Sequence, residues 1–229
     1  MRPEIILAAF GAESQRLSEV VEGADDAVFA RPSPCAPWTV AELVYHVRIT
    51  MGRLPTMLSS PDPAATDLAS AAAYYRPDQR FSASTNADRI QSAQRGAAAL
   101  SGAAARARDF SEARQQAWAR LQGAQPERVV QTRHGDRMLL TEFLRTRVLE
   151  LAVHGLDLAA ALERQPWMTP LAATVTEELL LPSAAAARLR TRAGWDRVTL
   201  IAKLTGRRPV APAETKLIQS LGIQWLALG

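Results

Sequence analysis

The stretch that decides the fold runs from Thr141 to Arg164 and reads TEFLRTRVLELAVHGLDLAAALER. Its apolar residues recur every three or four positions, which is the spacing typical of an α-helix. Four ionisable residues follow the same spacing: Arg147, Glu150, His154 and Asp157. At about 100° per residue, these four fall within an arc of about 80° on one face of the predicted helix.

Apolar side chains flank this row of ionisable residues on both sides. On one side are Leu144, Leu151, Leu158 and Leu162, and on the other are Leu149, Val153 and Leu156. The exposed face is therefore expected elsewhere, near Arg145, Ala152, Ala159 and Glu163. Buried charges are costly unless they are paired or bind a metal. The pattern thus predicts a partner or a metal ion for the ionisable row.

The length and composition predict an all-α protein with one large domain and a small appendage. The chain has 229 residues, of which 48% are hydrophobic, so a full core can form. We expect a four-helix bundle over residues 1–166 and a mostly helical C-terminal extension over residues 167–229.

Charge and cysteine content narrow the classes of partner and compartment. The net charge is only +4, and the basic residues are spread along the chain, which favours solvated helix faces over a nucleic-acid site. Cys35 is the only cysteine, so no internal disulfide is expected and a reducing cytosol is indicated. No signal-peptide pattern and no run of about 18 apolar residues is found. We expect a cytoplasmic protein with no nucleic-acid or membrane partner, and an alanine-rich helix could support a homodimer.

A second helix is predicted from Thr39 onwards. Thr39 and Glu42 form a capping-box pattern, in which each side chain can satisfy a free backbone donor at the helix start. This start places His46 in the second turn, beside apolar positions. Pro55 should end or kink the helix.

The remaining elements are predicted from periodicity and from turn residues. A helix is expected over 3–22, a long connection over 59–83, and an alanine-rich helix over 84–122 that could break near Gly102 or Phe110. The sequence VVQTRHGDRMLL predicts a hairpin that turns at His134-Gly135-Asp136. Helices are predicted over 169–193 and 195–204, and then a last helix with an extended tail.

His46, Glu150 and His154 form the candidate metal site. Facing helices of a bundle commonly carry such sites, and two imidazoles with one carboxylate suit zinc, and also iron or nickel. Three protein ligands leave one position open for water or substrate. Asp157 could orient His154 from behind or contact a substrate. The alternative is an internal pair of Arg147 and Glu150, with His46 as an ordinary core histidine.

Several other residues that could carry function are expected to have structural roles. Cys35 has no nearby charge in the sequence that would lower its pKa, so we expect it to be structural. His134 is expected at the surface of a turn, with a smaller chance of lining a pocket mouth, and Trp38 at the end of the bundle. Packing in the extension is expected for Trp195 and Trp225. Exposed turn positions are expected for Arg207 and Arg208, with binding of an anionic group of a thiol or substrate as the alternative.

Three segments resemble signatures of the mycothiol-dependent maleylpyruvate isomerase family, within the DinB-like superfamily. They are PCAPWTVAELVYHV, RVLELAVHGLDLAAAL and LTGRRP. The resemblance implies a DinB-like four-helix bundle and a divalent metal, usually zinc, held by His46, Glu150 and His154. It also implies mycothiol, a low-molecular-weight thiol, as co-substrate, and it places Asp157 on the aspartate of the family signature.

The function expected from these observations is that of a metal-dependent thiol enzyme. Such an enzyme would use mycothiol for S-transfer to, or thiol-assisted isomerisation of, a small electrophilic substrate. Arg147 could orient a substrate carboxylate, although pairing with Glu150 is favoured because salt partners on one helix face are common. The alternatives are a metal-binding helical module without catalysis and a metal-activated hydrolase.

Overall fold

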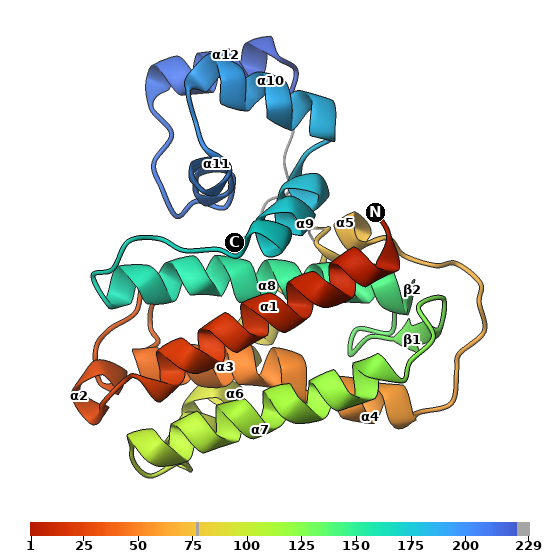
Figure 1. Cartoon of the computed structure of the whole chain (residues 1–229), viewed down its shortest axis with the longest axis vertical. Coiled ribbons are helices and arrows are strands. Elements are labelled where there is room, and N and C mark those ends of the chain that lie inside the picture. The colour runs from red at the N-terminus through yellow and green to blue at the C-terminus, as the bar shows by residue number, and fades with distance from the viewer. Residues whose placement is uncertain (77, 224–229) are drawn as a thin grey trace.

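The computed structural model describes residues 1–76 and 78–223 and is built almost entirely from helices (Figure 1). Four long helices form the bundle: α1 (Pro3–Glu22), α3 (Val40–Gly52), α7 (Ala103–Gln122) and α8 (Leu140–Ala161). Helix α1 packs against α7 and α8, and α3 packs against the same two helices. The predicted all-α bundle is confirmed.

Shorter elements fill the connections of the bundle. They are α2 (Asp26–Phe29), α4 (Leu54–Ser59), α5 (Ala71–Tyr74), the 3-10 turn η1 (Gln79–Phe81) and α6 (Ala83–Ala98). The predicted hairpin is present as β1 (Val129–Gln131) and β2 (Arg137–Leu139), which pair antiparallel with Val130 opposite Met138. Helix α6 lies against α3, so the region over 59–98 covers one side of the bundle.

Local signals in the sequence fix where several helices begin and end. Both hydrogen bonds of the Thr39–Glu42 capping box are made, at 2.7 and 3.4 Å, and α3 begins at the next residue. Pro55 lies in the first turn of the separate helix α4. Gly102, with a φ of +83°, separates α6 from α7, because this left-handed conformation suits only glycine well.

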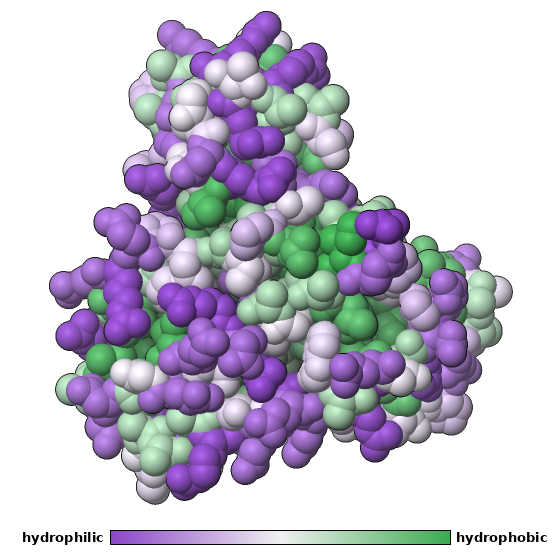
Figure 2. Space-filling view, in the orientation of Figure 1, coloured by the Kyte–Doolittle hydropathy of each residue, from purple (hydrophilic) through white to green (hydrophobic). Residues whose placement is uncertain are grey.

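The C-terminal part continues directly from the bundle. Helix α9 (Pro170–Leu180) packs on α1 and α8, and α10 (Ser183–Ala193), α11 (Arg197–Leu204) and α12 (Pro212–Ser220) form a lobe beyond it (Figure 1). Hydrophilic side chains dominate the lobe on the face that Figure 2 shows. The helix predicted over 169–193 is broken at Leu181-Pro182, and Trp225 with the predicted tail lies outside the described residues.

Helix α8 is buried on nearly all sides, which corrects one expectation. Ala152 and Ala159, predicted to be exposed, have no exposed surface; Arg145 is half-buried, and Glu163, beyond the helix end, is exposed. On the same face, a Cβ at Gly155 would lie 3.6 Å from Glu13 and 3.8 Å from Leu17 of α1. Helix α1 therefore covers the face that the sequence predicted to be exposed.

The apolar side chains of α8 contribute to two cores. Leu144, Leu151 and Leu158 pack in the core of the bundle, while Leu149, Val153 and Leu156 pack with the C-terminal helices. The ionisable row lies between these two apolar sets, as predicted. Among the described helices, none is long and apolar enough to cross a membrane.

Candidate metal centre

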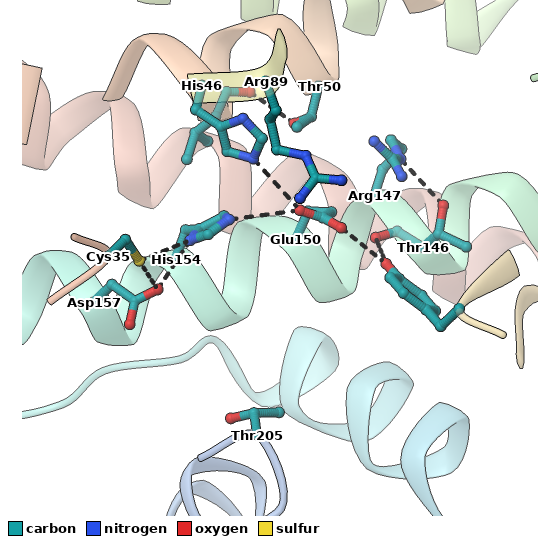
Figure 3. Close-up of polar contacts among 12 residues, drawn as sticks. Cys35, His46, Thr50, Arg89, Thr146, Arg147, Glu150, His154, Asp157 and Thr205 are labelled. Carbon is teal, nitrogen blue, oxygen red and sulfur yellow. Dashed lines mark hydrogen bonds and ion pairs between the residues drawn. The ribbon is translucent and has the colours of Figure 1, made fainter. Parts of the chain in front are cut away.

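Helices α3 and α8 bring the three candidate ligands together (Figure 3). The Oε2 atom of Glu150 lies 3.5 Å from Nε2 of His154 and 3.9 Å from Nε2 of His46. The ligand atoms of the three side chains all lie within 4.8 Å of one another. The spacing of Glu150 and His154 on one helix and the capped start of α3 together produce this cluster.

This arrangement fits a divalent cation. Ligands bound at about 2.1 Å in a tetrahedron lie roughly 3.4 Å apart, which is close to the observed separations of the carboxylate from both imidazoles. One carboxylate and two imidazoles are a donor set that zinc accepts, with one position left open. The residues present therefore fit a metal ion held by three protein ligands.

Asp157 holds His154 from behind. Its Oδ2 lies 2.9 Å from Nδ1 of His154, and the carboxylate is only 2% exposed. A proton on Nδ1 that is donated to Asp157 leaves the lone pair of Nε2 directed towards Glu150 and His46. Histidines that bind metals usually donate their other ring N–H in this way, to a carboxylate or a carbonyl. Asp157 thus positions His154.

The electrostatics of the cluster favour the protonated, positively charged form of His154. Burial opposes it, but hydrogen bonds to Asp157, Cys35 and Glu150 raise the pKa of His154 well above its usual value. Burial likewise opposes the low pKa of Glu150, which the two histidines hold well below its usual value. Burial lowers the pKa of His46 to about 4, so that this imidazole is a neutral donor at pH 7. The ionised Glu150 and the neutral His46 are in the states that bind a cation, whereas a cation at this site would displace the proton that the raised pKa keeps on Nε2 of His154.

Tyr75 fixes the second oxygen of Glu150. The hydroxyl of Tyr75 lies 3.1 Å from Oε1 of Glu150 and 3.1 Å from the carbonyl oxygen of Thr146. Tyr75 follows α5, whose first turn is tied to α8 by a 2.7 Å hydrogen bond from the backbone N–H of Ala71 to Glu142. A segment that the sequence indicated only as a connection therefore positions a candidate ligand.

Cys35 lies beside the candidate metal centre. The expectation that no charge lies near this thiol is therefore wrong. Its Sγ donates to Oδ2 of Asp157 at 3.1 Å and lies 4.0 Å from Nδ1 of His154. Cys35, His154 and Asp157 form a second group of potential ligands. It is the poorer cation site, because Arg207 already donates to both oxygens of Asp157.

Arg207 belongs to the site, although the sequence suggested an exposed turn. Its Nε and Nη2 donate to Oδ1 and Oδ2 of Asp157, both at 3.1 Å, and the side chain is 18% exposed. Burial opposes the ionisation of Asp157, but His154 and Arg207 together hold the pKa of Asp157 below its usual value. Arg208 is exposed, as expected.

Arg147 does not pair with Glu150, so the favoured interpretation of this residue was wrong. Its Nε donates to the hydroxyl of Thr146 at 3.1 Å. Its guanidinium lies over the ring of Phe143, 4.8 Å from the ring centre, and over Tyr74 at 5.4 Å. The residue is 6% exposed, and within the described residues no carboxylate lies within 4.0 Å of its nitrogens.

The three candidate ligands line a cavity of about 1070 Å³ between the bundle and the C-terminal lobe. Asp157, Cys35, Tyr75 and Thr205 also line it. Within the described part of the chain its wall holds three carboxylates, Asp88, Glu150 and Asp157, and nine arginines. The arginines are Arg53, Arg80, Arg89, Arg95, Arg133, Arg147, Arg164, Arg207 and Arg208.

His134 and Trp38 both lie near the cavity, and the sequence predicted a position for each. His134 is half-buried and lines the cavity beside Tyr74, with 6.0 Å between the ring centres, so the surface position that was expected is wrong. Trp38 is 7% exposed and packs in the core, as expected. Its ring also stacks on His46 with 4.7 Å between centres, which fixes the orientation of that imidazole.

Sequence reasoning missed Tyr75, Cys35 and Arg207, each of which comes from a segment outside α3 and α8. A signal existed for two of them. Cys35 and Arg207 lie inside the segments PCAPWTVAELVYHV and LTGRRP, which carry the family resemblance. The paired tyrosines at positions 74 and 75 were the only hint of Tyr75 in an otherwise alanine-rich stretch.

Comparison with known families agrees with this geometry. The model of the mycothiol maleylpyruvate isomerase N-terminal domain matches residues 10–159, which include His46, Glu150, His154 and Asp157. Neither a curated protein nor a solved structure matches the sequence. The match covers about two thirds of the chain and ends two residues before α8 does. The all-α, DinB-like fold agrees with it, and the chain belongs to the family of the mycothiol maleylpyruvate isomerase N-terminal domain, a family of mycothiol-related, metal-binding enzymes.

Proposed function

We propose that the protein is a metal-dependent enzyme that uses a low-molecular-weight thiol, mycothiol, on a small electrophilic substrate. The reaction is S-transfer to this substrate or its thiol-assisted isomerisation. The observation that carries the proposal is that the three donors of His46, Glu150 and His154 converge at the wall of a cavity of about 1070 Å³. This volume is at the upper end of the range of small-molecule sites, so it can hold a thiol and a second molecule together.

The chain's own residues supply the position and the protonation state of each donor. His46, Glu150 and His154 would hold the cation, for which we propose Zn²⁺. When bound, this cation lowers the pKa of a coordinating thiol, so that a thiolate is present at neutral pH. Asp157 keeps the proton on Nδ1 of His154, and Tyr75 fixes Oε1 of Glu150. The thiolate would attack an electrophilic carbon of the substrate in the cavity.

The cavity also bears on the two alternatives. A metal-binding module without catalysis needs no large cavity beside its ligands, so the observed volume supports an enzyme. A metal-activated hydrolase would need the same ligands and the same open position, with water in place of the thiol. Dependence on the thiol therefore separates the hydrolase from the proposed enzyme.

Metal analysis of the purified protein tests the ligand set. We expect about one equivalent of zinc in the wild type and a loss of stoichiometric metal in His154→Ala. His134→Gln is the matched control, because His134 lines the same cavity but lies outside the donor set. This variant should retain the metal. Absence of metal from the wild type after purification and zinc reconstitution, or equal metal content in all three proteins, would refute the ligand assignment.

Mass spectrometry of reactions with and without mycothiol tests the chemistry. The zinc-loaded protein would be incubated with a panel of small electrophiles, including alkyl halides, epoxides and cis-configured enones. We expect a thioether or an isomerised product that forms only with the thiol and only in the metal-loaded protein. Products that gain only water, at equal rates with and without the thiol, would support the hydrolase instead.

A further inference from the structure

One end of the cavity gathers arginines from five separate segments. Arg53 follows α3, Arg80 lies in η1, Arg89 on α6, Arg133 in the hairpin turn and Arg147 on α8. The ring of Tyr74 lies among them, with the guanidinium carbons of Arg147 and Arg80 at 5.4 and 5.7 Å from its centre. Side chains that are 94 residues apart in the sequence thus meet at one wall.

The chain neutralises only some of the arginines at this wall. Arg80 forms ion pairs with Asp78 at 2.8 Å and with Asp136 at 3.1 Å. Arg89 donates to neutral oxygens, the amide of Asn86 at 3.2 Å and the carbonyl of Arg80 at 3.1 Å. Arg80 is therefore a structural link between η1 and the hairpin, whereas the charge of Arg89 is available.

Arg147 is the clearest case in the described chain of a buried charge without an ion-pair partner; against the effect of burial, Tyr74 and the more distant carboxylate of Glu150 raise its pKa. Arg147 is 6% exposed and has two aromatic rings and a hydroxyl as its neighbours, with no carboxylate within ion-pair distance in the described chain. Cation–π contacts stabilise such a group by less than the cost of burying a charge. The site would gain stability from an anion.

The positive charges at this wall act on one another. Burial lowers the pKa of Arg53, and the charges of Arg133, Arg147 and Arg89 lower it further. His134 is at the same wall, where burial and the charges of Arg133, Arg80 and Arg89 lower its pKa to about 4. Besides burial, arginine charges lower the pKa of both Arg53 and His134, which indicates that positive potential is concentrated at this wall.

We name this set the arginine subsite, and it consists of Arg53, Arg89, Arg133 and Arg147. We propose that the arginine subsite binds an oxyanion group of a small molecule that carries two negative charges, as a pair of carboxylates or as a phosphate monoester. Guanidinium groups hold both groups through bidentate, charge-assisted hydrogen bonds. Four guanidiniums for which the described residues supply no ion-pair carboxylate favour a dianion over a monoanion.

The arginine subsite adjoins the metal centre. Arg147 lies one turn before Glu150 on α8, and the charge of Arg89 contributes to the low pKa of His46. Figure 3 shows Arg89 and Arg147 at the Glu150 end of the site, away from Asp157. An anion held here would present its other end to the metal centre. This orientation of a substrate rests on the proposed function, whereas the anion binding does not.

Calorimetric titration of the metal-free protein tests the subsite separately from any catalysis. The protein is treated with a chelator, and the probes are malonate, inorganic phosphate, acetate and the neutral analogue malonamide. We expect one saturable site for a dianion, weaker binding of acetate and no binding of malonamide. Malonate binding tighter than phosphate would indicate carboxylates as the natural group, and the reverse order would indicate a phosphate. Saturable binding of neither dianion would overturn the proposal.

Arginine variants locate the bound anion. Arg89→Gln and Arg133→Gln should each weaken dianion binding by about tenfold to 100-fold, because each loses hydrogen bonds to a charged group. Arg108→Gln on α7 makes the same change of charge at an exposed position outside the cavity and should bind as the wild type does. Affinities equal in all four proteins would overturn the proposal, and circular dichroism would check that each variant is folded.

The imidazole of His134 gives a second readout. A bound anion offsets the arginine charges, so saturating malonate or phosphate should raise the pKa of His134 from its low value of about 4. The chain has only three histidines, so ¹H–¹⁵N spectra of the ring nitrogens can resolve them. An unchanged pKa of His134 under saturating anion would place the anion elsewhere and overturn the assignment. Loss of metal binding with intact anion binding would refute the proposed function alone.

Discussion

Asp157 and Arg147 are buried charged residues ten positions apart on α8, and their surroundings differ: Asp157 has a charged partner, whereas Arg147 has neutral neighbours. Asp157 accepts hydrogen bonds from His154, Cys35 and Arg207, which together supply both a counter-charge and donors. Arg147 has aromatic rings and one hydroxyl around it. Where the chain supplies the counter-charge, the residue positions a neighbour. Where it does not, a ligand can supply the missing charge.

This comparison predicts effects of opposite sign on stability. In the metal-free protein, Arg207→Met leaves Asp157 buried with less compensation and should lower the free energy of unfolding by about 3 kcal/mol. Arg147→Met removes an uncompensated buried charge and should leave this free energy unchanged or raise it by about 1 kcal/mol. Urea unfolding followed by circular dichroism measures both. A loss of stability of similar size in the two variants would break the comparison.

A change of Asp157 tests its role in positioning the ligand. Asp157→Asn keeps the shape but weakens the hydrogen bond that holds His154, and it should reduce zinc affinity by about 10–100-fold. Chelator competition measures the affinity. Asp109→Asn is the matched control, because Asp109 pairs with Arg48 between α3 and α7, away from the candidate ligands. A zinc affinity of Asp157→Asn equal to that of the control would argue against the role in positioning.

Tyr75, like Asp157, holds a candidate ligand in position, and a smaller effect on zinc affinity is expected when its hydroxyl is removed. Tyr75→Phe removes one hydrogen bond to Oε1 of Glu150 and should weaken zinc binding by about fivefold, since a single hydrogen bond contributes about 1 kcal/mol. The same chelator competition applies, with Tyr45→Phe as control, because Tyr45 lies against Gly96 of α6 and lines a separate small pocket. Tighter zinc binding by Tyr75→Phe would mean that the hydroxyl competes with the metal for Glu150.

Glu13 is a third buried charge, and we expect its effect to be the smallest. Its Oε2 accepts hydrogen bonds from the backbone N–H and the hydroxyl of Thr169, while burial raises its pKa above 4.5. The folded state therefore retains a proton that the unfolded state has lost. The contribution of Glu13 to stability is full below pH 4.5 and is lost as pH rises through the raised pKa.

Glu13→Gln removes this titration. The unfolding free energy of the variant should fall less than that of the wild type as pH rises from 4.5 towards neutrality. Unfolding in urea at a series of pH values measures the difference. Glu163→Gln, at the exposed end of α8, is the control for a change of charge alone. Parallel pH profiles of Glu13→Gln and the wild type would show that Glu13 is already ionised in the folded protein.

Local sequence patterns were sufficient for the elements that depend on neighbouring residues. The Thr39–Glu42 capping box set the start of α3 and hence the position of His46. The spacing of Glu150 and His154 placed both on one face of α8, and their meeting with His46 followed from the bundle. Pairing of Arg147 with Glu150 could not be decided in this way, because the ring of Phe143, one turn away, and that of Tyr74, distant in sequence, compete for the same guanidinium.

The sequence by itself determined the helical bundle, the buried ionisable row and the three candidate ligands, because helix periodicity and capping act over only a few residues. Only the tertiary structure decided the surroundings of that row. Tyr75 reaches it from 75 residues away along the chain, Cys35 from 119 to 122 and Arg207 from 50. The burial of Ala152 and Ala159 depends on α1 in the same way. Contacts between distant segments leave no periodic pattern in the sequence. They decide which buried charges are paired within the described chain, as Asp157 is with Arg207, and which are not, as for Arg147.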